Sequence, residues 1–207
     1  MKPVLVAIVG GSASGKSTLA RDLVRSLRPG SALISQDSFY RDASRVPASR
    51  RRRLNFDHPR RIDWPLLLDV LTRALDGRAV DVPRYSFEDH ARESRTDRLK
   101  PSRFLVAEGL WLLRQREIRA LCDLGIFVAC PAPVRLARRI QRDTTERGRT
   151  RTEVLHQWST QTQPGFRDWV APQLRLADEI VRSPVPDDRV ADLTRRIRSL
   201  RTPRTSP

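Results

Sequence analysis

Cysteine, lysine and histidine are scarce in this sequence of 207 residues, and it contains no long apolar run. The two cysteines, Cys122 and Cys130, have neither metal-ligand spacing nor a partner motif, so we expect neither a disulfide scaffold nor a zinc site. A membrane-spanning helix needs about 18 consecutive apolar residues, and no such stretch is present. The apolar stretch near the N-terminus is short and lacks the pattern of a signal peptide. We therefore expect a cytoplasmic protein without a membrane partner.

Acidic residues are also few relative to basic ones, because 40 Lys and Arg residues stand against 24 Asp and Glu residues, a formal net charge of +16. Such a charge attracts polyanions, and a run of four arginines occupies positions 50–53. However, lysine occurs only at positions 2, 16 and 100, and the arginines are spread along the chain rather than gathered in one stripe. We therefore expect no nucleic-acid partner.

Nine residues near the N-terminus match the phosphate-binding pattern G-x-x-x-x-G-K-[ST]. They are Gly10, Gly11, Ser12, Ala13, Ser14, Gly15, Lys16, Ser17 and Thr18. The apolar run at 4–9 predicts a buried strand before the loop, and the apolar spacing at 18–27 predicts a helix after it. Glycines allow several backbone N–H groups to point at one phosphate chain, and a helix N-terminus adds partial positive charge. We expect Lys16 to bind the β- and γ-phosphates and the Ser17 hydroxyl to bind Mg²⁺.

The remaining chain alternates apolar strands with amphipathic helices, which indicates a three-layer α/β fold of the P-loop NTPase type with a central, mainly parallel sheet. Strands are predicted at 32–35, 103–107, 125–129 and 179–181, and helices at 64–76, 111–121, 134–147, 152–178 (interrupted at Pro164-Gly165) and 186–200. We predict a single domain over residues 1–201 and a disordered tail at 202–207. A predicted hairpin at 79–101 breaks the alternation and is suited to holding a second substrate.

An arginine-bearing helical lid is predicted at 135–165, because a mobile arginine lid can neutralise charge on a transferring phosphoryl group and exclude water. Within it, Arg135 and Arg142 are expected on a solvated helix face. Trp158, Phe166 and Trp169 are expected to be packing residues.

Two carboxylates directly follow predicted strands. Asp37 comes just after 32–35, and Glu108 comes just after 103–107. Ligands of open α/β sheets collect at the carboxyl ends of the strands, so both side chains are candidates for chemistry beside the phosphate loop, with Glu108 suited to magnesium. The alternatives are that Asp37 only caps a turn and that Glu108 only caps a helix.

Several blocks in consistent order over residues 4–181 together resemble uridine kinases (uridine/cytidine kinases). The blocks are the phosphate loop, Ser35-Gln36-Asp37-Ser38-Phe39-Tyr40, Asn55-Phe56-Asp57-His58-Pro59, Pro83 with Tyr85, Phe87 and His90, Glu108-Gly109, and Arg138 to Asp143 with Glu146-Arg147-Gly148-Arg149. The resemblance implies transfer of the γ-phosphate of ATP or GTP to the 5′-hydroxyl of uridine or cytidine in pyrimidine salvage, with Mg²⁺ as cofactor. It also implies a homo-oligomer.

The resemblance implies a role for each matching residue. Asp37 resembles the catalytic carboxylate, with Lys16 serving the transferred phosphate, and Asp57 resembles the ligand of the ribose hydroxyls. Tyr85 and His90 resemble the base-recognition pair. The remaining implied contacts are Tyr40, Phe56 and Phe87 around the base, Arg139, Arg149 and Gln157 on substrate or phosphate, and Ser17, Asp37 and Glu108 around the metal.

Three departures from the family pattern leave the phosphate donor open between ATP and GTP. Ser86 stands where the family usually has Asp, Arg60-Arg61 replaces an acidic-small pair, and the usual P-R-G is absent after Val181. Two alternative functions also remain open. One is a related P-loop kinase acting on pantothenate or a sugar phosphate, and the other is an arginine-rich nucleic-acid-binding protein with a regulatory nucleotide site.

Overall fold

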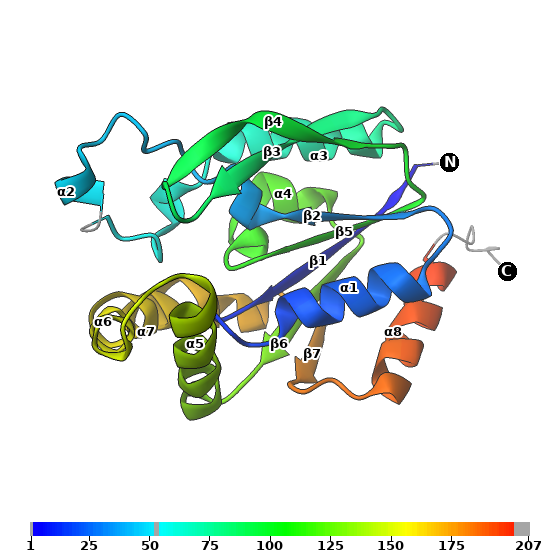
Figure 1. Ribbon diagram of the computed structural model, residues 1–207. Coiled ribbons are helices and arrows are strands. Elements are labelled where there is room, and N and C mark those ends of the chain that lie inside the picture. Colours follow the sequence, from blue (N-terminus) through cyan, green and yellow to red (C-terminus); the bar gives the residue numbers. More distant parts are fainter. Residues whose placement is uncertain (1, 52–53, 201–207) are drawn as a thin grey trace, which may run out of the picture.

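A five-stranded parallel sheet forms the centre of the computed structural model, which describes residues 2–51 and 54–200 (Figure 1). The strands are β1 (Val4–Gly10), β2 (Ser31–Ser35), β5 (Phe104–Gly109), β6 (Leu124–Ala129) and β7 (Glu179–Arg182). They lie in the order β2-β5-β1-β6-β7, and every neighbouring pair is parallel. The predicted α/β fold with a parallel sheet is therefore confirmed, whereas the tail predicted at 202–207 lies outside the described residues.

The central strand β1 is buried on both faces, which explains its uninterrupted apolar sequence. Leu5, Ala7 and Val9 point into one core, and Val4, Val6 and Ile8 point into the other. This alternation is the two-residue period of a strand. The sheet therefore separates two hydrophobic cores, each covered by helices.

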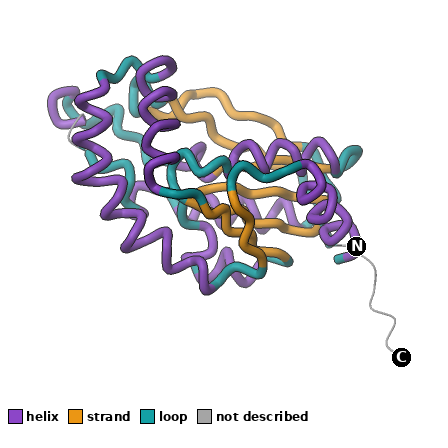
Figure 2. The backbone as a smooth tube through the Cα atoms, turned by 90° about the horizontal axis from the view of Figure 1, so that it is seen from below, coloured by secondary structure: helices purple, strands orange, loops and turns teal. Residues whose placement is uncertain are grey.

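Helices cover both faces of the sheet, and Figure 2 shows the strands lying between them. The helices α1 (Lys16–Ser26) and α8 (Asp187–Ser199) pack on one face through Leu19, Leu23, Leu193 and Ile197. The other face is covered by α3 (Trp64–Leu75), by α4 (Arg116–Leu121) and by the 3₁₀ turn Leu112–Arg114. The single helix predicted at 111–121 is thus divided into a turn and a short helix. Among the described residues, no helix is long and apolar enough to cross a membrane.

The predicted hairpin is present and consists of the antiparallel strands β3 (Val80–Ser86) and β4 (Ala91–Leu99). Its tip is fixed to the segment after β2, because Ala43 N–H donates to the His90 carbonyl at 3.0 Å and Arg92 donates to the Tyr40 carbonyl at 3.1 Å. The short helix α2 (Ala48–Arg51) and the 3₁₀ turns Gln36–Phe39 and Pro59–Arg61 complete this side of the molecule. The hairpin therefore stands over the carboxyl end of β2.

A nearly continuous helical segment follows α5 (Ala132–Glu146), and the interruption predicted at Pro164-Gly165 is wrong. The helix α6 (Arg151–Gln157) continues through a π-helical turn (Trp158–Thr162), α7 (Gln163–Gly165), a second π-helical turn (Phe166–Val170) and the 3₁₀ turn Ala171–Arg175. Proline lacks the N–H that an α-helix requires, and the wider π turns on either side accommodate this loss without breaking the helical path. Thr162 and Phe166 keep right-handed helical dihedral angles.

Candidate active site

The predicted phosphate loop connects β1 to α1 at the carboxyl edge of the sheet, so the sequence pattern has its required strand and helix. Gly15 has a φ of +94°, a left-handed conformation that glycine adopts without steric cost, and Ser14 N–H donates to the Gly11 carbonyl at 3.1 Å. A Cβ on Gly10 would lie 2.8 Å from Ser14 Oγ and 2.8 Å from the Val128 carbonyl. The loop is therefore tightly wrapped, with its backbone next to the N-terminus of α1.

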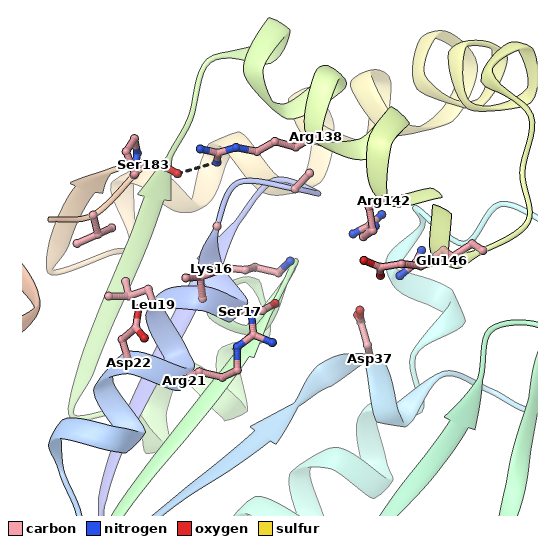
Figure 3. Close-up of a pocket in the computed structure, with 16 residues that line it drawn as sticks. Lys16, Ser17, Leu19, Arg21, Asp22, Asp37, Arg138, Arg142, Glu146 and Ser183 are labelled. Carbon is pink, nitrogen blue, oxygen red and sulfur yellow. Dashed lines mark hydrogen bonds between the residues drawn. The ribbon is translucent and has the colours of Figure 1, made fainter. Parts of the chain in front are cut away.

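The two carboxylates predicted from strand ends lie next to this loop. The β-sheet register pairs Ser35 with Glu108, and Ser35 Oγ donates to Glu108 Oε1 at 2.7 Å. Asp37 N–H in turn donates to Ser35 Oγ at 3.3 Å, while Lys16 Nζ lies 3.8 Å from Glu108 Oε2. Figure 3 shows Lys16 and Asp37 pointing toward one another across a cavity, as the shared edge of parallel strands requires.

Asp37 has an environment that favours its protonated form. Burial is the largest cause, and the charge of Glu108 adds to it, so the pKa of the Asp37 carboxyl is raised. The positive charges of Lys16, Arg147 and Arg142 act in the opposite direction and reduce this shift. The result is a carboxylate of raised basicity, a property found in general bases.

The oxygen atoms in this region fit a magnesium ion. Glu108 Oε2 is buried and has no hydrogen-bond partner, and it lies 3.8 Å from Nζ of Lys16. Lys16, Ser17 and Asp37 line one cavity. Within residues 2–51 and 54–200, no group of three or more His, Cys, Asp or Glu side chains is placed to hold a metal without a substrate. Mg²⁺ is commonly held by one or two protein oxygens together with substrate phosphates, so a bound nucleotide would complete its ligands here.

Five aromatic side chains gather between the hairpin and the segment after β2. The ring of Tyr40 lies 5.8 Å from Phe56, 5.3 Å from Tyr85 and 5.9 Å from Phe87, and His90 stacks on Phe56 at 4.4 Å. The Tyr85 hydroxyl and His90 Nδ1 are buried without hydrogen-bond partners. Burial raises the pKa of Tyr85 to about 12, and burial followed by the charge of Arg149 lowers the pKa of His90. Both groups are therefore neutral hydrogen-bonding groups at pH 7.

Asp57 is held by side chains from the lid predicted at 135–165. Thr162 Oγ1 donates to Asp57 Oδ2 at 2.7 Å, and Arg139 Nη2 lies 3.4 Å from the same oxygen. Arg139 also donates to Ser12 Oγ of the phosphate loop at 3.1 Å and to Gln157 Oε1 at 3.4 Å. The structure thus brings the predicted residues Asp57, Arg139 and Gln157 together beside the loop.

Two cavities meet at the carboxyl edge of the sheet. The phosphate-loop cavity, of about 550 Å³, extends from the loop to Arg138 and Ser183, and the aromatic cavity, of about 60 Å³, is lined by Tyr40, Phe56 and His90 among others. Four side chains line both cavities, namely Lys16, Asp37, Arg142 and Arg147. The two cavities therefore adjoin at these four residues.

Arg135 does not lie on a solvated face, and this expectation is wrong. The Arg135 side chain is 1% exposed, with its guanidinium 4.0 Å from the ring centre of Phe166 and 5.1 Å from that of Trp158. Arg135 Nε donates to the Cys130 carbonyl at 3.2 Å, and Nη1 lies so close to the phosphate loop that a Cβ on Gly11 would be 2.7 Å away. The aromatic rings and the carbonyl compensate for desolvation of this cation.

Arg142 also departs from the expectation, because it binds a buried carboxylate that the sequence did not single out. Asp143 is completely buried, and Arg142 Nε donates to its Oδ1 at 2.8 Å. Arg139, Arg147 and Arg149 surround the same carboxylate. The spacing is a sequence signal that would have found it, since Asp143 stands four residues after Arg139 and four before Arg147, which places all three on one helix face.

The parallel sheet with a phosphate loop between its first strand and first helix defines a P-loop kinase fold. The sequence pattern of the Phosphoribulokinase / Uridine kinase family matches residues 5–191, and the chain belongs to this family. It is accordingly a phosphotransferase.

Related sequences match this one over most of its length. A uridine kinase of Clostridium botulinum (strain Kyoto / Type A2) is 39% identical over 181 residues, which are 87% of this chain and 88% of that protein. A uridine kinase of Deinococcus deserti is 37% identical over 182 residues, with the same coverage.

Among solved structures, phosphoribulokinase from Rhodobacter spheroides has a TM-score of 0.65 at 18% identity, covering 87% of this chain and 70% of that one. D-glycerate 3-kinase from Cryptococcus neoformans has a TM-score of 0.62 at 17% identity, covering 81% and 79%. At these identities the structural likeness concerns the fold alone.

Proposed function

We propose that this protein transfers the γ-phosphate of ATP or GTP to the 5′-hydroxyl of uridine and of cytidine, giving UMP and CMP in pyrimidine salvage. The observation that carries the proposal is the meeting of the two cavities at Lys16, Asp37, Arg142 and Arg147. A nucleoside triphosphate in the phosphate-loop cavity and a nucleoside in the aromatic cavity would present their reacting groups at this point. The relatives named as uridine kinases support the choice of nucleoside.

The chemical step follows from the groups at the meeting point. The 5′-oxygen forms a bond to the γ-phosphorus, the bond from that phosphorus to the β,γ-bridging oxygen breaks, and the electron pair stays on the leaving diphosphate. Asp37 orients the hydroxyl and accepts its proton, while Lys16 and the two arginines neutralise charge on the transferring group. Ser17, Asp37 and Glu108 would hold Mg²⁺ together with the phosphates, and the bound ion would supply further charge neutralisation.

Nucleoside recognition is assigned to the aromatic cavity. Tyr40, Phe56 and Phe87 enclose the base, Asp57 binds the ribose hydroxyls, and Arg139, Arg149 and Gln157 provide further contacts. Tyr85 and His90 each can donate or accept a hydrogen bond, so they tolerate either O4 of uracil or N4 of cytosine.

The aromatic cavity must expand before it can hold a nucleoside. A volume of about 60 Å³ is far below the roughly 300 Å³ at which small-molecule pockets begin. The His90 imidazole stacks on Phe56 at 4.4 Å, the place where a flat base would stack. We therefore infer that His90 moves away from Phe56 when the nucleoside binds.

A panel of acceptors tests the proposal directly. Purified protein is given Mg²⁺ with ATP or GTP and one of uridine, cytidine, pantothenate, ribulose 5-phosphate or no acceptor, and nucleoside diphosphate release is measured in a coupled assay. We expect turnover with uridine and cytidine only. The Lys16→Ala variant, with its fold checked by circular dichroism, should give none. Turnover with another acceptor but with neither nucleoside would overturn the proposal.

We also propose the assembly, the domain organisation, the location and the partners that were predicted from the sequence. They are a cytoplasmic homo-oligomer, a single kinase domain over residues 1–201 with its lid at 135–165, and no nucleic-acid or membrane partner. Light scattering tests the oligomer, and a gel shift at moderate salt tests the nucleic-acid alternative, which requires binding with a steep salt dependence.

A further inference from the structure

Asp143, near the end of α5, is the centre of the arginine cluster, by which we mean Arg139, Arg142, Arg147 and Arg149. Oδ1 of Asp143 lies 2.8 Å from both Nε and Nη2 of Arg142 and 3.7 Å from Nε of Arg147. Oδ2 lies 3.0 Å from Nη1 of Arg149 and 3.5 Å from Nε of Arg139. Both oxygens of one fully buried carboxylate are therefore occupied by guanidinium groups.

The backbone brings the last arginine back to this carboxylate. After α5 ends at Glu146, Gly148 has a φ of +60°, a left-handed conformation that glycine adopts most readily. The chain reverses there, and Arg149 N–H donates to the Asp143 carbonyl at 3.0 Å. Asp143 thus holds the end of α5 and the following turn together through both its side chain and its backbone.

Each arginine extends from Asp143 into the candidate active site. Arg139 contacts Ser12 of the phosphate loop and Asp57. Arg147 places its guanidinium 4.5 Å from the ring centre of Phe87 on the hairpin, and Arg142 lines both cavities. The carboxylate does not itself line either cavity. Any effect of Asp143 on chemistry must therefore act through the arginines.

Asp143 and the arginine cluster together carry an excess of positive charge, because one carboxylate faces four guanidinium groups. Burial acts to raise the pKa of Asp143, but the arginines, led by Arg142, outweigh it and hold the pKa below its ordinary value. Asp143 is therefore ionised at neutral pH and removes one of four positive charges. The remaining excess faces the cavities, where phosphates would balance it.

We propose that Asp143 is a positioning residue, which fixes the four arginines for phosphoryl transfer and, by neutralising part of their charge, weakens the binding of small inorganic anions in place of the nucleotide. The first part rests on the proposed kinase function. The second part concerns anion binding alone and stands whichever acceptor the enzyme uses.

The test compares Asp143→Asn with the wild-type protein, using inorganic pyrophosphate as the binding probe in isothermal titration calorimetry. Asparagine keeps the size and removes the charge, so we expect pyrophosphate to bind about tenfold more tightly. We also expect kcat to fall by about 100-fold, because the arginines lose their common anchor, while the KM for nucleoside changes less. If Asp143 served folding alone, the Asp143→Asn variant would bind pyrophosphate more weakly and would also have lower activity.

Asp97→Asn is the matched control, because it raises the net charge equally at an exposed pair with Arg84 on the hairpin. It should leave both pyrophosphate affinity and kcat near their wild-type values. Unchanged pyrophosphate affinity or unchanged kcat in Asp143→Asn overturns the proposal.

A second variant applies if Asp143→Asn does not fold. Asp143→Glu keeps the charge but displaces the carboxylate by one methylene, so we expect pyrophosphate affinity near the wild-type value and kcat reduced at least about tenfold. A wild-type kcat in Asp143→Glu would contradict the positioning role. If the wild-type enzyme phosphorylates neither nucleoside, the proposed function fails, and kcat is then measured with the acceptor that does react.

Discussion

Asp37 combines two features at the residue scale, since its side chain lines both cavities and its pKa is raised by burial. We expect Asp37→Asn to lower kcat by about 100-fold or more, because a positioned base contributes about that factor. Nucleotide binding should stay within a few-fold of the wild-type value. Steady-state kinetics and the thermal midpoint are measured on the same preparation.

The competing role for Asp37 is a turn cap, and the structure provides a control for it. The side chain that caps the turn Gln36–Phe39 is Ser35, whose Oγ accepts from Asp37 N–H. Ser35→Ala should therefore lower the thermal midpoint, whereas Asp37→Asn should mainly lower kcat. A destabilised but fully active Asp37→Asn variant would contradict the catalytic role.

The pH dependence of kcat/KM offers a second test of Asp37. Only the ionised carboxylate can accept a proton, so activity is lost as the pH falls through the Asp37 pKa, and the raised pKa places this acid limb above the ordinary aspartate range of about 4. After burial, the charge of Glu108 is the largest cause of the raised pKa. In the Glu108→Gln variant, the acid limb of the remaining activity should therefore shift to lower pH. A shift to higher pH would exclude the assignment of this limb to Asp37.

Base recognition is predicted to depend on Tyr85 and His90, whose hydroxyl and Nδ1 atoms are buried without hydrogen-bond partners. Tyr85→Phe removes the hydroxyl and His90→Ala removes the imidazole, so each should raise the nucleoside KM and change the ratio of uridine to cytidine turnover. The KM for the phosphate donor should change little. The assignment fails if both variants keep the wild-type nucleoside KM and ratio.

At the element scale, the close contact between β5 and the turn after β2 positions the carboxylates of Asp37 and Glu108. A Cβ on Gly109 would overlap the Gln36 side chain, with Oε1 at 2.5 Å, and Gln36 Oε1 also accepts from Trp111 N–H. Gly109 adjoins Glu108, and Gln36 adjoins Asp37. This glycine therefore allows the two carboxylates to lie near one another.

Gly109→Ala should accordingly disturb the site as well as the fold. Overpacking of this kind costs about 2 kcal/mol of the free energy of unfolding, and displacement of Gln36 should move Asp37 and lower kcat in the folded protein. Gly125→Ala in β6 is the control, because its Cβ would meet the movable methyl groups of Leu113, the nearest at 3.0 Å, and Asp178 Oδ2 only at an ordinary contact distance of 3.4 Å. Chemical denaturation and kinetics on both variants check the prediction, which fails if Gly109→Ala keeps the wild-type kcat.

Local sequence signals were sufficient for the elements that carry their own pattern. The apolar run of β1, the glycines of the loop and the strand ends before Asp37 and Glu108 each depend on a few adjacent residues. The π turns around Pro164 were not predictable in this way, because a proline locally signals the end of a helix. Here the helical path continues past Pro164 because tertiary packing stabilises it. Likewise, the buried state of Arg135 depends on rings that follow it by more than 20 residues in the sequence.

At the scale of the whole molecule, many exposed arginines form ion pairs with nearby acids. Examples are Arg25 with Asp22, Arg73 with Asp69 and Arg98 with Asp81. Exposed pairs of this kind stabilise a fold by at most about 1 kcal/mol each, so they are not a major source of stability. The excess of basic residues nevertheless leaves a net charge of +16, whose field acts on any charged ligand that approaches.

This field predicts different salt dependences for the two proposed substrates. The donor nucleotide is an anion and is attracted by the net positive charge and by the arginine cluster, whereas uridine is neutral. Salt screens charges beyond about 10 Å at 0.1 M ionic strength. We therefore expect kcat/KM for the donor to fall about fivefold between 50 mM and 300 mM salt. The KM for uridine should change by less than about twofold over the same range, since apolar stacking in the aromatic cavity is insensitive to screening. Initial rates with one substrate saturating and the other varied separate the two, with sodium chloride and potassium acetate compared to exclude a specific ion effect. An equal salt dependence for both substrates would contradict this prediction. It would mean that salt changes the enzyme itself rather than the electrostatic attraction of the nucleotide.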